Sequence, residues 1–368
     1  MKVVVPAEIR PGERRVAAMP ESVKRLLAAG LEVVVESGAG RYAHASDADF
    51  EAVGAAVATG DVLARADVVL HVSPLTPDQI ALLRSGAVTI GFLAPGTNAD
   101  GIRAARDAGV TALSVELLPR ISRAQSMDAL TSQALVAGYR AALVAADRLP
   151  VFLPLLMTAA GTIKPAKVLV LGAGVAGLQA IATAKRLGAV VSAYDVRPAS
   201  ADEVRSMGAK FVELDLEVLE GAGGYAREMG EDRAARQREL LAPYVASADA
   251  VITTAAIPGR PAPLLVTRAM VEAMRPGSVV VDLAAESGGN VEGVIAGEEV
   301  TIGGATVWGG RDVPSQMPVD ASRLFARNVS DLLLLMTKDG VVAPDWDDEI
   351  TAGCWVTRDG AVREGVTV

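Results

Sequence analysis

Three glycines, Gly172, Gly174 and Gly177, have the spacing G-x-G-x-x-G, which is typical of turns that bind the pyrophosphate of a dinucleotide. The first glycine allows the tight bend, the second leaves room for the phosphates, and the third lets the following helix pack on the preceding strand. Asp195, about 20 residues later, would accept hydrogen bonds from the ribose hydroxyls of NAD and repel the 2′-phosphate of NADP. These residues predict a binding site for NAD(H).

The glycines are flanked by segments that would position them. Val168–Leu171 is a short apolar run with β-branched residues, which predicts a buried parallel strand. Leu178–Leu187 predicts a helix that ends at Gly188, and the pyrophosphate would lie on the free N–H groups at its N-terminus. Val190–Tyr194 predicts a second strand, and Asp195 follows it directly. Strand, turn, helix, strand and acid have the order of a dinucleotide-binding unit.

A second group of polar residues lies between 117 and 128, where Arg120, Gln125 and Asp128 stand close together in the sequence. The segment is irregular, and the run Ala129–Leu149 after it predicts a long helix that crosses to the next domain. Most segments of this kind are solvated loops between domains. Loops over a cleft between domains, however, often bind ligands. The residues alone leave both interpretations open.

Strands alternate with helices along the chain, in units of about 30 residues, which is typical of parallel sheets covered by helices on both faces. We predict an α/β fold of two Rossmann-like, doubly wound parallel-sheet domains with a cleft between them. The second domain, 131–302, binds NAD and is inserted into the first, 1–130 with 303–368. The first has no Gly-rich turn and is expected to bind substrate, a partner or part of a cofactor. Further predicted elements are 2–6, 23–29, 31–35, 68–72, 81–84, 88–92, 101–108, 111–115, 250–254, 267–274, 278–282 and the return helix 318–335.

Composition limits the classes of function. The chain has 368 residues, 51% of them hydrophobic, but no apolar run long enough to cross a membrane and no signal-peptide pattern at its start, so we expect no membrane insertion. The net charge of −9 disfavours nucleic acid as a partner. A single cysteine, Cys354, fits a reducing compartment, and with only two histidines no metal site is expected.

The chain resembles domain I, the NAD(H)-binding component of proton-translocating nicotinamide nucleotide transhydrogenase. The family's nicotinamide-contacting loop carries an Arg, a Gln and an Asp, which Arg120, Gln125 and Asp128 match. The resemblance covers nearly the whole chain, and the segments 120–128 and 222–226 are more specific than the glycine turn. The other matching segments are 157–162, 172–189, 252–255, 281–284 and 312–315.

The resemblance implies a set of binding residues. Near the nicotinamide these are Arg120, Gln125, Asp128 and Thr131, where relatives carry serine at the last position. On the pyrophosphate and adenosine side, besides the three glycines, they are Val175, Asp195, Val196 and Arg197, and those that line or close the pocket are Gly224, Tyr225 and Ala256.

The resemblance also implies an activity and partners. Hydride would pass directly from NADH to NADP⁺ held on a separate subunit, and a membrane-spanning subunit would couple this transfer to proton movement. The chain itself would be a homodimeric, peripheral subunit on the cytoplasmic side of the membrane. The run 332–336 beside 341–342 would make the dimer contact, or it is ordinary core.

Alanine dehydrogenase is the main alternative, because it shares the fold and the glycine region. Oxidative deamination needs proton transfer, for which that family uses a lysine and a histidine on two turns of its first domain. The corresponding turns here read 73–75 Ser-Pro-Leu and 93–95 Leu-Ala-Pro, and the first 163 residues hold only Lys2 and Lys24. Arg15 lies in a segment that resembles the arginine region that binds the substrate carboxylate, but one arginine cannot deaminate an amino acid.

Three further expectations follow from the residues. His71 lies in an apolar run and is expected in the core, whereas His44 is expected on the surface. The segment 218–240 is either a flexible surface excursion or, as the resemblance implies, a mobile loop that closes over the nucleotide with Tyr225 as its contact. A non-catalytic NADH-sensing module is a third hypothesis, which the polar loop at the nicotinamide end disfavours.

Overall fold

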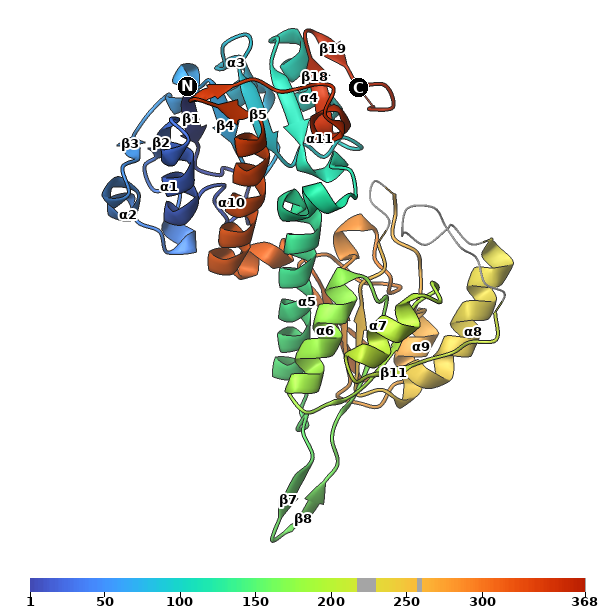
Figure 1. The fold of residues 1–368 in the computed structure, drawn as a ribbon. Coiled ribbons are helices and arrows are strands. Elements are labelled where there is room, and N and C mark those ends of the chain that lie inside the picture. The colour runs from blue at the N-terminus through green and yellow to red at the C-terminus, as the bar shows by residue number, and fades with distance from the viewer. Residues whose placement is uncertain (217–229, 257–259, 368) are drawn as a thin grey trace. The chain divides into compact units, whose positions relative to one another are not determined.

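The computed structural model describes residues 1–216, 230–256 and 260–367 (Figure 1). The chain forms two compact units, one made of Met1–Gln133 and Pro314–Val368 and the other of Ala134–Val313. The boundary after Gln133 falls inside the helix α5 (Ala129–Arg148). Each unit is built on its own sheet, and we describe each in turn.

The first unit contains an eight-stranded sheet with the order β19-β18-β6-β5-β4-β1-β2-β3. The six strands from β6 to β3 are parallel, and β18 and β19 join antiparallel at one edge. Strand order reverses between β1 and β4, which makes the carboxyl ends of these two strands the switch point of the sheet. The strands are β1 (Lys2–Val5), β2 (Glu32–Glu36), β3 (Ala56–Ala58), β4 (Val68–Leu70), β5 (Val88–Gly91), β6 (Thr111–Ser114), β18 (Trp355–Arg358) and β19 (Ala361–Val362).

Helices cover both faces of this sheet. On one face α1 and α10 bury Leu26, Phe325 and Val329 against the strands, and on the other α3 and α4 bury Ile80 and Ile102. The run that we considered for a dimer contact belongs to the first of these cores, because Leu332, Leu333 and Met336 are buried there. The helices and short turns are α1 (Pro20–Ala28), η1 (Arg41–Ala43), α2 (Asp47–Ala52), η2 (Val62–Arg65), α3 (Pro77–Ala81), α4 (Ala99–Asp107), η3 (Val115–Leu117), η4 (Ser122–Met127), α10 (Pro318–Leu335) and α11 (Glu349–Cys354), with a small β16–β17 hairpin (Thr337–Lys338, Val341–Val342).

The second unit contains a seven-stranded sheet with the order β11-β10-β9-β12-β13-β15-β14, parallel except for β14. Its switch point lies between β9 and β12. The sheet packs on α5, α6 and α7 on one face and on α8 and α9 on the other. The elements are β9 (Lys167–Leu171), α6 (Val175–Arg186), β10 (Val190–Tyr194), α7 (Ser200–Ser206), β11 (Lys210–Phe211), α8 (Glu231–Ser247), β12 (Ala250–Thr253), α9 (Arg268–Glu272), β13 (Val279–Asp282), η6 (Ala285–Ser287), β14 (Glu299–Ile302), β15 (Ala305–Gly309) and η7 (Val313–Gln316), of which the last crosses the boundary between the units.

A two-stranded hairpin, β7 (Leu156–Thr158) with β8 (Gly161–Ile163), projects from the second unit and pairs with no other strand (Figure 1). Its side chains are unusually exposed for apolar residues, since Met157 is 80% accessible. The segment leading into it exposes Val151, Phe152 and Leu155 as well. An isolated two-stranded hairpin is marginally stable in water, so this one needs a partner surface.

The predicted order of strands and helices agrees with the structure except at a few places. The helix expected at 81–84 is instead α3, which begins at Pro77 after the capping residue Thr76. The hairpin β7–β8 and the edge strands β18 and β19 were not predicted, because short polar strands have a weak sequence pattern. Helix α8 begins at Glu231, so part of the stretch expected to be irregular is helical.

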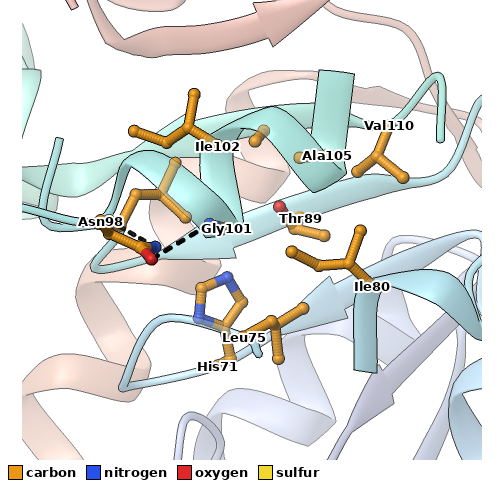
Figure 2. A pocket seen from close by; sticks show the side chains of 11 residues that line it. His71, Leu75, Ile80, Thr89, Asn98, Gly101, Ile102, Ala105 and Val110 are labelled. Carbon is orange, nitrogen blue, oxygen red and sulfur yellow. Dashed lines mark hydrogen bonds between the residues drawn. The ribbon is translucent and has the colours of Figure 1, made fainter. Parts of the chain in front are cut away.

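His71 is completely buried, as expected, one residue beyond the end of β4. Its Nδ1–H donates to the Ser73 carbonyl at 2.8 Å, which leaves Nε2 as an acceptor without a partner among the described residues. A cavity of about 20 Å³ lies beside the ring, and Figure 2 shows the ring among Leu75, Thr89 and Asn98. Burial lowers the pKa of His71 to about 4, although the hydrogen bond to Ser73 opposes this shift.

We therefore expect His71 to make the fold sensitive to acid. Unfolding exposes the ring, which then binds a proton below its ordinary pKa of 6.5, so stability falls as the pH drops from about 6.5 to about 4. The loss is about 3 kcal/mol. His71→Asn cannot be protonated and should lose this slope, whereas His44→Asn, at the exposed histidine, should keep it. Denaturant unfolding of the three proteins over this pH range measures the difference, and equal slopes for wild type and His71→Asn would contradict it.

Candidate functional site

The glycine turn connects β9 to α6 at the switch point of the second sheet. Gly172 has a φ of +101°, which favours glycine, and a Cβ there would lie 2.6 Å from Thr254 Oγ1. Gly177 packs on the turn so closely that a Cβ would lie 1.9 Å from the Gly172 carbonyl oxygen. Two of the three glycines are therefore required by backbone contacts within the protein itself.

Gly174 is different, because no atom lies within 4 Å of the position that its Cβ would occupy. It is the N-cap residue of α6, and no side chain caps this end of the helix. The first N–H groups of the helix, from Val175 onward, therefore meet open space. This arrangement fits the pyrophosphate of a dinucleotide, which needs both a close approach to the backbone and free N–H donors.

Asp195 follows β10 and already has partners in the protein. Its carboxylate accepts hydrogen bonds from the Ala173 N–H at 2.7 Å and from Arg197 Nε and Nη2, both at 2.9 Å. The acid thus holds the glycine turn at the same time as it positions Arg197 beside it. Val196 is half-buried between them, and Asp195 raises the pKa of Arg197 by hydrogen bonding.

Sequence reasoning missed the group that supports the other side of this turn. Thr254 Oγ1 donates to the Gly172 carbonyl at 3.1 Å, and the next residue, Ala255, is held by Asn290. The Asn290 amide accepts from the Ala255 N–H at 3.0 Å and donates to the carbonyls of Ala255 and Pro263, both at 2.8 Å. Its own N–H donates to Asp282. Asn290 thus ties both ends of the segment that contains Ala256, which is exposed. A lone asparagine after two glycines gave no signal for this role.

The predicted nicotinamide-side residues lie in the first unit, on or beside η4. Gln125 is exposed, and within the described residues its side chain makes no hydrogen bond. Arg120 and Thr131 are exposed as well. Asp128 accepts hydrogen bonds from the Thr131 N–H at 2.9 Å and from its hydroxyl at 2.6 Å, so it caps α5. We expected Asp128 to pair with Arg120; its carboxylate is instead held by Thr131, because it stands at the helix start.

Arg15 is buried and its donors are used within the protein. Its Nε and Nη2 groups donate to the two oxygens of Glu13 at 2.8 and 2.7 Å, and Nη1 donates to Gln133 at 2.9 Å. Burial raises the pKa of Glu13, but the hydrogen bonds and charge of Arg15 outweigh it and lower that pKa to about 2. Ser315 adds a hydrogen bond to Glu13. The guanidinium is therefore committed to Glu13 and not to a substrate carboxylate.

Carboxylates also occupy the turns that follow strands of the first sheet. Glu8 accepts hydrogen bonds from the N–H groups of Val72 and Ser73 after β4, at the switch point. Burial raises the pKa of Glu8 to about 7. Glu116 does the same for Leu93 and Ala94 after β5. N–H groups that would bind an anion in other α/β sheets are thus filled by the chain's own acids.

Comparison with known proteins places these two units in a known context. A family model described as "Alanine dehydrogenase/PNT, N-terminal domain" matches residues 4–137, and the model of the C-terminal domain matches residues 141–365. The first segment of the NAD(P) transhydrogenase alpha subunit of Rhodospirillum rubrum, a separate protein there, is 48% identical over 98% of this chain and 97% of that protein. The chain belongs to the family of NAD(P) transhydrogenase alpha subunits.

The solved structures agree with this membership. A transhydrogenase from Sinorhizobium meliloti matches with a TM-score of 0.88 and 45% identity, covering 99% of both chains. Alanine dehydrogenase of Bacillus subtilis is more distant, at 32% identity over 80% of this chain and 73% of that protein. The predicted family and the two-domain α/β fold class are confirmed, and alanine dehydrogenase is a distant relative that shares the fold. The transhydrogenase alpha subunits belong to an oxidoreductase that uses nicotinamide nucleotides.

Some predicted features of this transhydrogenase alpha subunit are absent from the site described above. Gly224 and Tyr225 lie outside the described residues. Among the residues that the structure describes, no group of His, Cys, Asp or Glu side chains forms a metal-binding cluster. No described helix has the length and apolar character that crossing a bilayer requires.

Proposed function

We propose that the chain binds NAD(H) on its second unit and transfers hydride directly between NADH and NADP⁺ held on a partner subunit. One observation carries this proposal: the glycine turn is open for a pyrophosphate, while Arg15, the residue that would bind an amino acid substrate, is saturated by Glu13. The alternatives, alanine dehydrogenase and an NADH-sensing module, lack comparable support.

The residues divide the work between them. Gly172, Gly174 and Gly177 shape the pyrophosphate turn, and Val175 lies at the start of the helix whose N–H groups receive the phosphates. Asp195, with Val196 and Arg197, binds the adenosine ribose. Ala256, Gly224 and Tyr225 line or close the pocket. The nicotinamide supplies the hydride when the nucleotide is bound.

On the nicotinamide side, Arg120 and Thr131 orient the ring, and Asp128 holds Thr131 by capping α5. Gln125 reaches toward the nucleotide of the partner. Direct hydride transfer involves no proton at the reacting carbon, so a site that orients two rings and excludes water is sufficient. A nucleophile and a titrating base are not needed.

The partners follow from the same chemistry. We propose an NADP(H)-binding subunit that presents its nucleotide to Gln125, and a membrane-spanning subunit that couples transfer to proton movement. The chain would act as a peripheral subunit on the cytoplasmic side of the membrane, where single cysteines such as Cys354 stay reduced.

The experiment that tests the proposal is an assay of the purified chain with NADH and the NADP-binding subunit. We expect reduction of NADP⁺ that depends on both proteins. Alanine with NAD⁺, and pyruvate with ammonia and NADH, serve as controls and should give no turnover. Alanine-dependent reduction of NAD⁺ would overturn the proposal in favour of the dehydrogenase, and NADH binding without transfer would favour the sensing module.

Cofactor choice gives a prediction at Asp195. NADH should bind much more tightly than NADPH, because the carboxylate accepts the ribose hydroxyls and repels a 2′-phosphate. Asp195→Ala should weaken NADH binding by about 10- to 100-fold, since hydrogen bonds to a charged group contribute about 1.5–3 kcal/mol. It should also narrow the preference, because Arg197 is left beside the ribose without its acid. Titration of both nucleotides measures this; equal affinities in the wild type would show that Asp195 does not face the ribose.

We further propose that the chain is a homodimer in which the β7–β8 hairpin packs on a second copy. The hairpin and the segment before it expose Phe152, Leu155 and Met157, and its strand edges have no partner within the described residues of the chain. Met157→Asp should produce monomers, seen by light scattering, because it places a charge in the buried contact. Val341→Asp, at an exposed apolar residue of the first unit, is the matched control. A dimeric Met157→Asp variant would contradict this contact.

A further inference from the structure

A series of polar side chains runs through the first unit from the loop after β1 to η4. Arg15 donates to Gln133 Oε1 at 2.9 Å, and Gln133 Nε2 donates to Ser132 Oγ at 3.1 Å and to the Ala321 carbonyl at 3.1 Å. Ser132 Oγ donates in turn to Asn328 Oδ1 at 2.7 Å. Arg15, Gln133 and Asn328 are all buried, so these contacts form in a low dielectric.

Asn328 ends the series at the turn that carries Gln125. Its Nδ2 donates to the Ser126 carbonyl at 2.8 Å, one residue after Gln125. A carbonyl can only accept and the Ser132 hydroxyl donates, so the two ends of the amide cannot be exchanged without losing both bonds. Carbonyls in the last turn of a helix lack partners within the helix, and Asn328 supplies the one that Ser126 needs.

The other anchors of η4 act elsewhere. Ala124 and Met127 are buried in the core and hold the turn from below. Arg123 pairs with Asp348, the capping residue of α11, at the surface. Asn328 is the buried polar contact next to Gln125 in the sequence, and it lies on α10, which the core of the unit holds firmly through Phe325. It therefore ties the backbone at Gln125 to the most rigid neighbour that the turn has.

We propose that Asn328 is a positioning residue for hydride transfer: it fixes the peptide beside Gln125 and so sets where the Gln125 amide meets the nucleotide of the partner. This inference rests on the proposed function. In this arrangement the Arg15 region, which belongs to the substrate site in the dehydrogenases, supports the transfer loop, because Arg15 and Glu13 stand at the far end of the same series of contacts.

The test uses Asn328→Asp in the full chain, assayed with the NADP-binding subunit. The aspartate keeps the acceptor for Ser132 but cannot donate to the Ser126 carbonyl when ionised. We expect the single-turnover rate constant to fall on the order of ten-fold, less than the roughly 100-fold cost of a 1 Å misplacement, with NADH affinity within about three-fold of wild type. Loss of folded protein would lower the amplitude of the reaction and not its rate constant, so the two effects are separable.

A double-mutant cycle with Gln125→Asn gives the decisive readout. If Asn328 acts through Gln125, the loss caused by Asn328→Asp should be much smaller in the Gln125→Asn background. Asn328→Leu, which is uncharged, serves if the aspartate variant does not fold. Ser330→Ala is the matched control: Ser330 is buried on the same helix, its hydroxyl has no partner among the described residues, and its rate should equal that of wild type.

Each outcome has one meaning. A wild-type rate in Asn328→Asp, or equal losses in both backgrounds of the cycle, overturns the role of Asn328 and leaves the proposed function standing. Absence of transfer in the wild-type chain with its partner overturns the proposed function itself. A slower rate that disappears in the Gln125→Asn background supports the inference.

Discussion

Gln125→Asn is expected to slow hydride transfer to the partner's NADP⁺ on the order of 100-fold, because one methylene less misplaces the amide by about 1 Å. NADH affinity should stay within a few-fold of wild type. The structure supports this separation, since Gln125 is exposed and, among the described residues, is not bonded to its own turn. An interaction made only when both rings meet lowers the barrier without tightening the ground state.

Single-turnover transfer with the NADP-binding subunit, together with NADH titration of the same variant, measures this effect. Arg120→Ala is the comparison on the NADH side: it should weaken nucleotide binding, since it removes a charged group from that side. A wild-type transfer rate in Gln125→Asn, or a loss of NADH binding in proportion to the rate, would show that Gln125 has another role.

Gly174→Ala should weaken NADH binding by about 100-fold or more while leaving the fold intact. No atom of the protein lies within 4 Å of the added methyl group, and the φ of −74° suits alanine, so the unfolding free energy should not change. The methyl group would occupy the space of the pyrophosphate. Displacing it removes several hydrogen bonds to a charged group, each contributing about 1.5–3 kcal/mol.

The matched control is Gly177→Ala, three residues along the same turn. There the added Cβ would lie 1.9 Å from the Gly172 carbonyl oxygen, so the backbone must move and the protein should lose stability even without ligand. NADH titration and thermal unfolding of both variants distinguish the two kinds of glycine. Wild-type affinity in Gly174→Ala would mean that the pyrophosphate does not lie on this turn.

The second unit could be predicted closely from the sequence because its signals are local. The apolar run at β9, the glycines and the acid at Asp195 lie within about 30 residues and follow the geometry of one βαβ unit. What Asp195 does besides facing a ribose was not predictable: its bonds to Ala173 and Arg197 depend on how the turn and strand come together in space.

The support for the nicotinamide-side turn was not predictable for the same reason. Ser126 and Asn328 are 202 residues apart in sequence, and Arg123 and Asp348 are 225 apart. No periodicity or spacing links such pairs. The expected pair of Arg120 and Asp128 was a local guess, and local capping of α5 by Asp128 prevailed because a carboxylate at a helix start finds free N–H groups at once. The roles of the individual site residues stay predictions.

The ion pair between Glu13 and Arg15 sets a condition on any attempt to engineer amino acid dehydrogenase activity into this chain. Introducing a lysine and a histidine on the turns after β4 and β5 would restore the proton-transfer groups but would leave no free cation for the carboxylate of an amino acid, because both oxygens of Glu13 are bonded to Arg15. Removing Glu13 to free that cation would leave a buried charge unpaired, at a cost of about 3–5 kcal/mol until a ligand replaces it. New catalytic activity on this scaffold would therefore depend on substrate to stabilise the fold.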